Sequence, residues 1–126
     1  MAHTTGTEPP ALDFYALRPE VTDELLAEMT RRIVERFHPH KVILFGSYAY
    51  GTPHRDSDVD LFVIMDSDER PAVRAARVKE VARERFLPMD VIVRTPEEVR
   101  ERLRIGDHFV RDVLEQGKVM HDSGAL

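Results

Sequence analysis

The sequence contains no cysteine in its 126 residues, which excludes a disulfide framework and zinc sites built from thiolates. It also contains no apolar run that approaches the ~20 residues needed to span a bilayer. Its N-terminal stretch, MAHTTGTEPP, lacks the basic and apolar regions of a secretory signal peptide. Together these absences predict a cytoplasmic protein.

An excess of positive charge is absent as well, since the formal net charge is −5 at pH 7. A broad basic surface is therefore not predicted, and direct binding of nucleic acid is not expected. The length and the hydrophobic content of 42% suit one domain with one core. We expect residues 1–18 to form a flexible tail and residues 19–126 to form that domain.

Hydrophobic patterning predicts helices that alternate with short strands. An amphipathic stripe with a repeat near four residues runs from Val21 to Phe37 and predicts a helix. Short β-rich runs predict strands at 41–45, 58–65, 89–94 and 118–122. The alternation predicts an α/β or α+β fold, in which a small mixed sheet is flanked by helices.

Capping signals place two further helices. One helix is expected to have Pro71 in its first turn and to be capped by Ser67 or Asp68. A second is expected to begin at Thr95, because a proline follows it and Glu98 stands where a capping box requires an acidic residue.

The most informative motif is the segment Gly46-Ser47-Tyr48-Ala49-Tyr50-Gly51, followed by Ser57-Asp58-Val59-Asp60-Leu61. Alternate residues of a strand point to the same face, so Asp58 and Asp60 are expected to project side by side. Adjacent carboxylates repel unless a cation lies between them, and Mg²⁺ prefers such hard oxygen ligands. The glycine turn, expected to lead into a short helix, offers N–H groups and a hydroxyl to an anion. The motif therefore predicts a site for a metal-bound nucleoside triphosphate.

Two other phosphate or metal motifs do not fit these residues. Gly46 and Gly51 have the spacing of a P-loop, but Thr52-Pro53 stands where that motif requires Lys followed by Ser or Thr. The aspartates between 56 and 60 resemble the start of a calcium loop. That loop would have Leu61 at its glycine position and Ser67 at its bidentate glutamate position.

The order and spacing of Gly46-Ser47, Gly51 and Ser57-Asp58-Val59-Asp60-Leu61 resemble the signature of the polymerase-β-type nucleotidyltransferases. The small size resembles the minimal nucleotidyltransferases of prokaryotes, many of which are antitoxins encoded beside a helical HEPN-domain protein. The resemblance implies a nucleotidyltransferase fold and transfer of AMP from ATP to an acceptor hydroxyl, with release of pyrophosphate. It implies two Mg²⁺ ions as cofactors and a HEPN-type toxin as the partner that is adenylylated.

The resemblance also implies roles for individual residues. Asp58 and Asp60 are expected to bind the metal ions. Asp90, polar within an apolar run, is expected to be the third carboxylate on a neighbouring strand and to activate the acceptor. The nucleotide-binding residues are expected to be Gly46, Ser47, Gly51 and Ser57.

The chain departs from the family pattern at Tyr50, where many relatives have arginine. Arg55 and Arg94 are candidates to replace that cation. Several alternatives stay open at this point. Asp90 fits a structural residue at the start of a strand, and the protein fits an antitoxin that neutralises its partner by contact alone. It also fits an enzyme that modifies a small molecule, as antibiotic-modifying relatives do.

Overall fold

The computed structural model describes residues 14–54 and 56–125. In these residues four strands form one mixed sheet, with the order β3-β2-β1-β4. The central pair β1 and β2 is antiparallel, β4 pairs antiparallel with β1, and β3 pairs parallel with β2. The strands are β1 (Lys41–Phe45), β2 (Val59–Ile64), β3 (Met89–Arg94) and β4 (Lys118–Asp122). The predicted fold class is confirmed.

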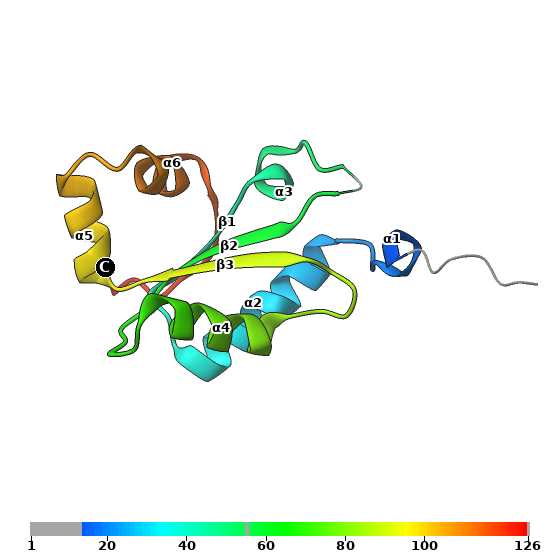
Figure 1. The fold of residues 1–126 in the computed structure, drawn as a ribbon, viewed down its shortest axis with the longest axis horizontal. Coiled ribbons are helices and arrows are strands. Elements are labelled where there is room, and N and C mark those ends of the chain that lie inside the picture. The colour runs from blue at the N-terminus through cyan, green and yellow to red at the C-terminus, as the bar shows by residue number, and fades with distance from the viewer. Residues whose placement is uncertain (1–13, 55, 126) are drawn as a thin grey trace, which may run out of the picture.

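Helices lie against both faces of this sheet (Figure 1). In the view of Figure 1, α2 and α4 lie below the sheet, α6 lies above it, and α3 follows the end of β1. The helices are α1 (Phe14–Leu17), α2 (Asp23–Phe37), α3 (Ser47–Tyr50), α4 (Pro71–Ala82), α5 (Pro96–Arg104) and α6 (His108–Gln116). No helix within 14–54 or 56–125 has the length and apolar character to cross a bilayer.

The expected tail, residues 1–18, falls mostly on residues 1–13, which lie outside the described part of the chain. The segment from residue 14 to residue 17 forms the short helix α1.

The two faces of β2 carry different side chains, because residues of a strand alternate between faces. Leu61 and Val63 belong to the core that is closed by α2 and α4. Phe62 and Ile64 belong to a second cluster, which is closed by α5 and α6. Asp60 lies on the same face as Phe62, so this carboxylate projects toward the side of α6.

Helix starts show where the capping predictions hold. Thr95 accepts a hydrogen bond from the Glu98 N–H and the Glu98 side chain accepts one from the Thr95 N–H, so the predicted capping box is confirmed. The cap predicted for α4 is wrong, because Arg70 is its N-cap and makes no side-chain cap hydrogen bond. Proline restricts the residue before it to extended conformations, so the residue preceding Pro71 becomes the cap.

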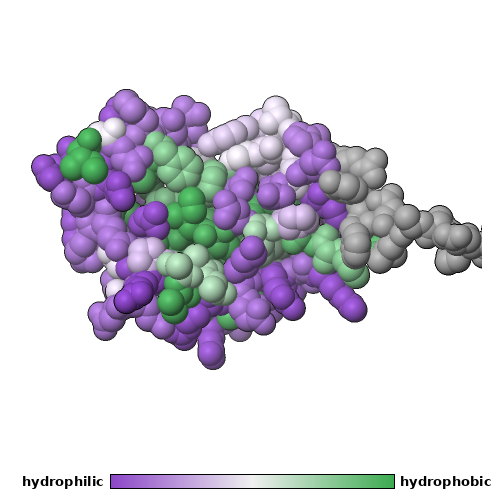
Figure 2. Space-filling view, in the orientation of Figure 1, coloured by the Kyte–Doolittle hydropathy of each residue, from purple (hydrophilic) through white to green (hydrophobic). Residues whose placement is uncertain are grey.

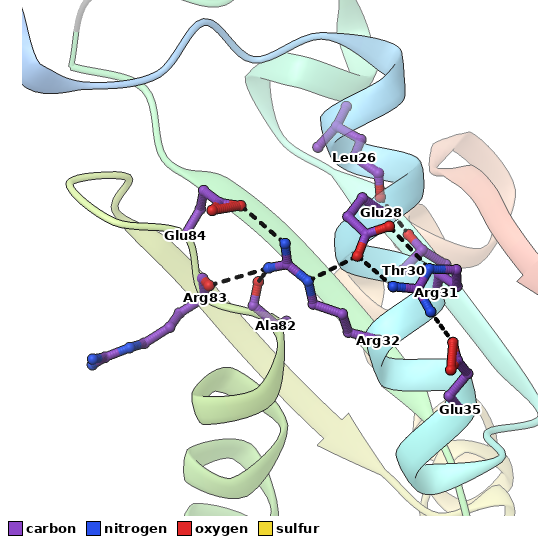
Figure 3. A network of polar contacts seen from close by, with 9 residues as sticks. All are labelled: Leu26, Glu28, Thr30, Arg31, Arg32, Glu35, Ala82, Arg83 and Glu84. Atoms are coloured by element: carbon purple, nitrogen blue, oxygen red, sulfur yellow. Dashed lines mark hydrogen bonds and ion pairs between the residues drawn. The ribbon is translucent and has the colours of Figure 1, made fainter.

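Arg32 ties α2 to the turn that precedes β3 (Figure 3). Its guanidinium donates to the carbonyls of Ala82 and Arg83 at 3.4 Å and pairs with Glu84 at 3.3 Å. It also donates to Glu28 on its own helix at 3.1 Å. These contacts fix the chain shortly before β3 and so help to place the first residues of that strand.

Arg74 joins α4, β3 and α5 from a nearly buried position, with 5% of its surface exposed. It donates to both carboxylate oxygens of Glu98 at 2.6 and 3.0 Å. Further donation goes to the carbonyl of Glu69 at 2.8 Å and to that of Val93 at 3.3 Å. Because Glu98 also closes the capping box of α5, one ion pair fixes both helices to the sheet.

Candidate active site

Asp60 and Asp90 lie directly opposite each other on the parallel strands β2 and β3. Neighbouring strands are ~4.8 Å apart, and residues in register on parallel strands point to the same face. The structure therefore brings together the carboxylate of the motif and the carboxylate predicted for a neighbouring strand. Asp60 is partly buried and Asp90 is exposed, so the pair opens to solvent on the β3 side.

The negative charges of Asp90 and Asp58 both act on the carboxyl group of Asp60. The pKa of Asp60 is raised to about 6, first by burial and then by the negative charges of Asp90 and Asp58. Asp58 lies one residue before β2. The predicted start of this strand, residue 58, was therefore one residue too early. Like charges held this close favour either a proton or a bound cation.

The donor set fits a divalent ion that also binds substrate. Across residues 14–54 and 56–125, no three side chains of His, Cys, Asp or Glu form a ready metal-binding group. Mg²⁺ is usually bound by one or two carboxylates together with substrate phosphates, and closed cages of protein ligands are not needed. The carboxylates of Asp60 and Asp90, in register and open to solvent on the β3 side, match that mode of binding.

Gly46 places the glycine turn against Asp60. It has φ 75° and ψ −159°, a backbone conformation that is essentially restricted to glycine. A Cβ atom at this position would lie 2.2 Å from Oδ2 of Asp60. The close approach of the turn to the carboxylate therefore depends on the absence of a side chain. Ser47 begins α3 directly after this turn, so the Gly46-Ser47 pair and Asp60 meet at the same end of the sheet.

The other two predicted nucleotide-binding residues have structural roles in the turn and the loop. Gly51 is the left-handed C-cap of α3, where it donates its N–H to the carbonyl of Ser47. Ser57 is buried, and its hydroxyl accepts a hydrogen bond from the His54 N–H at 2.8 Å. The carbonyl of Ser57 accepts a hydrogen bond from the guanidinium of Arg18. Sequence reasoning missed this contact, since Arg18 stands next to a proline in a segment without periodicity.

The position of Arg94 in the structure decides whether it can replace the arginine that many relatives have at position 50. Arg94 is the last residue of β3, four residues from Asp90, and donates to the carbonyl of Val93. At ~3.3 Å per residue it lies at the opposite end of the sheet from the aspartates, so Arg94 as the missing cation is wrong. Arg55 lies outside the described residues, and Tyr50 is an exposed residue at the end of α3.

Replacing Gly46 by alanine is expected to displace the Asp60 carboxylate and to weaken divalent-dependent nucleotide binding. The strained backbone adds a loss of stability of about 1–3 kcal/mol. Gly51→Ala is the matched control, because Gly51 also has a positive φ but a Cβ atom there would meet no other atom within 4 Å. Urea unfolding and nucleotide titration of both variants provide the measurement. Equal behaviour of the two variants in nucleotide titration would contradict the contact between Gly46 and Asp60.

The mixed sheet, the paired carboxylates and the glycine turn together define a nucleotidyltransferase-type architecture. A crystal structure described as a putative nucleotidyltransferase from Sulfolobus solfataricus has the same fold, with a TM-score of 0.56 over 81% of each chain and 19% identity.

The chain belongs to the nucleotidyltransferase domain family, whose model matches residues 26–120. It is 31% identical over 83 residues to a Methanocaldococcus jannaschii protein named "Putative protein adenylyltransferase". That match covers 64% of this chain and 77% of the relative. The family assignment agrees with the resemblance to minimal nucleotidyltransferases drawn from the motif.

Proposed function

We propose that this nucleotidyltransferase transfers AMP from ATP to a hydroxyl of a protein acceptor and releases pyrophosphate. The observation that carries the proposal is the pair of Asp60 and Asp90 in register, with the backbone of Gly46 against Asp60. The acceptor oxygen forms a bond to the α-phosphorus, and the bond from that phosphorus to the oxygen bridging to the β-phosphate breaks. The acceptor proton leaves to Asp90 or to water.

The strand order supports separate positions for the two substrates. Asp60 lies on the inner strand β2, with β1 and its glycine turn on one side and β3 with Asp90 on the other. The triphosphate therefore binds on the β1 side, near Gly46 and Ser47. The acceptor approaches on the β3 side, where Asp90 is exposed.

Asp58, Asp60 and Asp90 are the residues that would hold the Mg²⁺ ions. When bound, two such ions neutralise the charge on the attacking and leaving oxygens. Phosphoryl-group transfer depends mainly on positioning and on charge neutralisation, and a cluster of carboxylates provides sites for the neutralising cations. The Asp60 carboxylate is oriented by the adjacent turn, and Asp90 is free to contact the acceptor.

The acceptor that we propose is a small helical HEPN-type toxin, which makes this protein an antitoxin. The name of the M. jannaschii relative supports a protein acceptor. The choice of a HEPN-type toxin rests on the resemblance to minimal nucleotidyltransferases, many of which are antitoxins. A stable complex of this kind would bury about 1,200–2,000 Å².

ATP is expected to bind only with a divalent cation, because the aspartate cluster repels a bare triphosphate. Calorimetric titration with Mg²⁺ and in EDTA measures this, and equal affinity in both conditions would refute the metal site.

Mass spectrometry of the co-purified partner should reveal added AMP. A neutralised partner without AMP would instead indicate an antitoxin that acts by contact alone. Transfer only to small molecules would indicate an enzyme of the antibiotic-modifying kind.

A further inference from the structure

Phe109 is an aromatic residue that the core leaves half exposed. It lies in the first turn of α6, and 45% of its surface is accessible, whereas Val110 and Val113 of the same helix are buried. Its ring meets Phe45 edge to face, with centroids 5.5 Å apart and an interplanar angle of 82°. It meets Phe62 at 6.5 Å with a tilt of 58°. Neither of these rings stacks flat on Phe109.

Both of these neighbours border the aspartate pair. Phe45 is the register partner of Asp60 across β1 and β2, and it immediately precedes Gly46. Phe62 follows Asp60 by two residues and points to the same face of the sheet. Because cross-strand Cβ atoms are ~4.5–5.5 Å apart, the ring of Phe109 stands only one side chain away from Asp60.

The surface beside Phe109 is apolar as well. Figure 1 shows β1 and β2 passing beneath α6 toward α3, and Figure 2 shows a hydrophobic patch that extends from α6 onto the strands. Ile92, on the same face as Asp90, packs against this cluster and is only partly buried. A planar group attached to the triphosphate and extending toward α6 would therefore contact the aromatic ring of Phe109 and the apolar side chains beside it.

We propose that Phe109 is the platform on which the nucleobase of the bound triphosphate stacks. The proposal rests on the proposed function, since it assumes that the triphosphate binds at Gly46 and the aspartates. The triphosphate lies beside Phe45 and the acceptor takes the β3 side, so the nucleoside extends toward α6. Stacking recognises the flat face that every base has, so this contact selects for a base without reading its hydrogen-bonding edge.

The test separates the base from the phosphates by titrating two probes, Mg²⁺–ATP and Mg²⁺–tripolyphosphate. Phe109→Leu keeps an apolar side chain on Phe45 and Phe62 but removes the aromatic face. We expect ATP binding to weaken by about 5- to 150-fold, the range typical of base–aromatic stacking, and tripolyphosphate binding to stay unchanged. Ile105→Ala is the control, because Ile105 is 55% exposed at the turn between α5 and α6 and is expected to leave both probes unaffected.

A second variant gives a spectroscopic signal. The chain has no tryptophan, so Phe109→Trp introduces a single tryptophan that can be excited selectively over the tyrosines. This variant should restore ATP affinity, and its fluorescence should be quenched by ATP but not by tripolyphosphate. Unchanged ATP affinity in Phe109→Leu, or equal weakening of both probes, would overturn the stacking platform. Failure of the proposed function looks different: wild-type protein would bind ATP equally well in EDTA, or Asp60→Asn would bind it as tightly as wild type.

Discussion

Asp90→Asn is expected to reduce AMP transfer by about 10²–10⁴-fold, the range for loss of a proton acceptor at a reacting hydroxyl. Most of the divalent-dependent ATP affinity should remain. The reason is position: Asp90 lies on β3, on the far side of Asp60 from the glycine turn at the end of β1. Single-turnover transfer of labelled AMP and nucleotide titration on the same preparation measure the two effects separately.

Asp60→Asn and Asp58→Asn are the contrasting variants. Asp60 is in contact with the turn at Gly46 and shares its electrostatic environment with both other aspartates. These variants are therefore expected to lose ATP affinity and transfer together. Near-normal transfer by Asp90→Asn would remove Asp90 from the catalytic set and would leave a two-aspartate site.

Stability measurements without metal provide the control for folding. The pKa of Asp60 is raised to about 6 in the folded protein, so the folded state holds the proton more tightly than the unfolded state does. The contribution of this group to stability is present at low pH and is lost as pH rises through about 6. Asp60→Asn should consequently be more stable than wild type at pH 8, by about 1 kcal/mol after allowance for solvent screening. At pH 4 the two proteins should be nearly equal.

Arg74→Met is expected to reduce stability by about 1–3 kcal/mol, because it leaves the carbonyls of Glu69 and Val93 without this donor and the partly exposed carboxylate of Glu98 without its partner. Arg74 is nearly buried and makes four hydrogen bonds that join α4, β3 and α5. Arg77→Met is the matched control on the same helix. Its pair with Glu69 is exposed, and such pairs contribute about 0–1 kcal/mol. Urea unfolding of both variants measures the difference.

The same ion pair gives a pH dependence. The guanidinium of Arg74 lowers the pKa of Glu98 to about 2, well below its usual range. Stability from this group is therefore present above the ordinary glutamate pKa and is lost as pH falls toward about 2. Wild-type protein should lose stability over that acid range, whereas Arg74→Met should show a smaller change. Identical acid profiles would show that the ion pair does not govern acid stability.

Local signals were enough to predict the four strands to within a residue and to select Asp60 and Asp90, which the structure places in register. The run from residue 89 to residue 94 is β-rich except for Asp90, and an isolated polar residue of this kind indicates a functional site. Strand register could not be derived from the sequence, because the pairing of Asp60 with Asp90 depends on long-range contacts. The role of Gly46 was predictable as a turn but not as a close approach to a carboxylate.

The errors arose where tertiary structure decides between similar local options. Ser67 and Asp68 are good caps by residue type, but the proline at position 71 selects Arg70. Arg94 was a reasonable cation by charge alone, and only the direction of β3 separates it from the aspartates. Phe109 stands beside the buried Val110 in the sequence, and only the structure shows that 45% of its surface is exposed.

The strand order holds the carboxylates of Asp60 and Asp90 in place to different degrees. Asp60 belongs to β2, which is hydrogen-bonded to a strand on each side, whereas Asp90 belongs to the edge strand β3, which is hydrogen-bonded on one side only. Local motions cost less free energy where a segment has fewer backbone hydrogen bonds to its neighbours. A small displacement of β3 would move Asp90, whereas Asp60, held between two neighbouring strands, would keep its position. In the reaction that we propose, ATP would be held at the firmly placed Asp60, while Asp90 could adjust to the shape of an incoming acceptor.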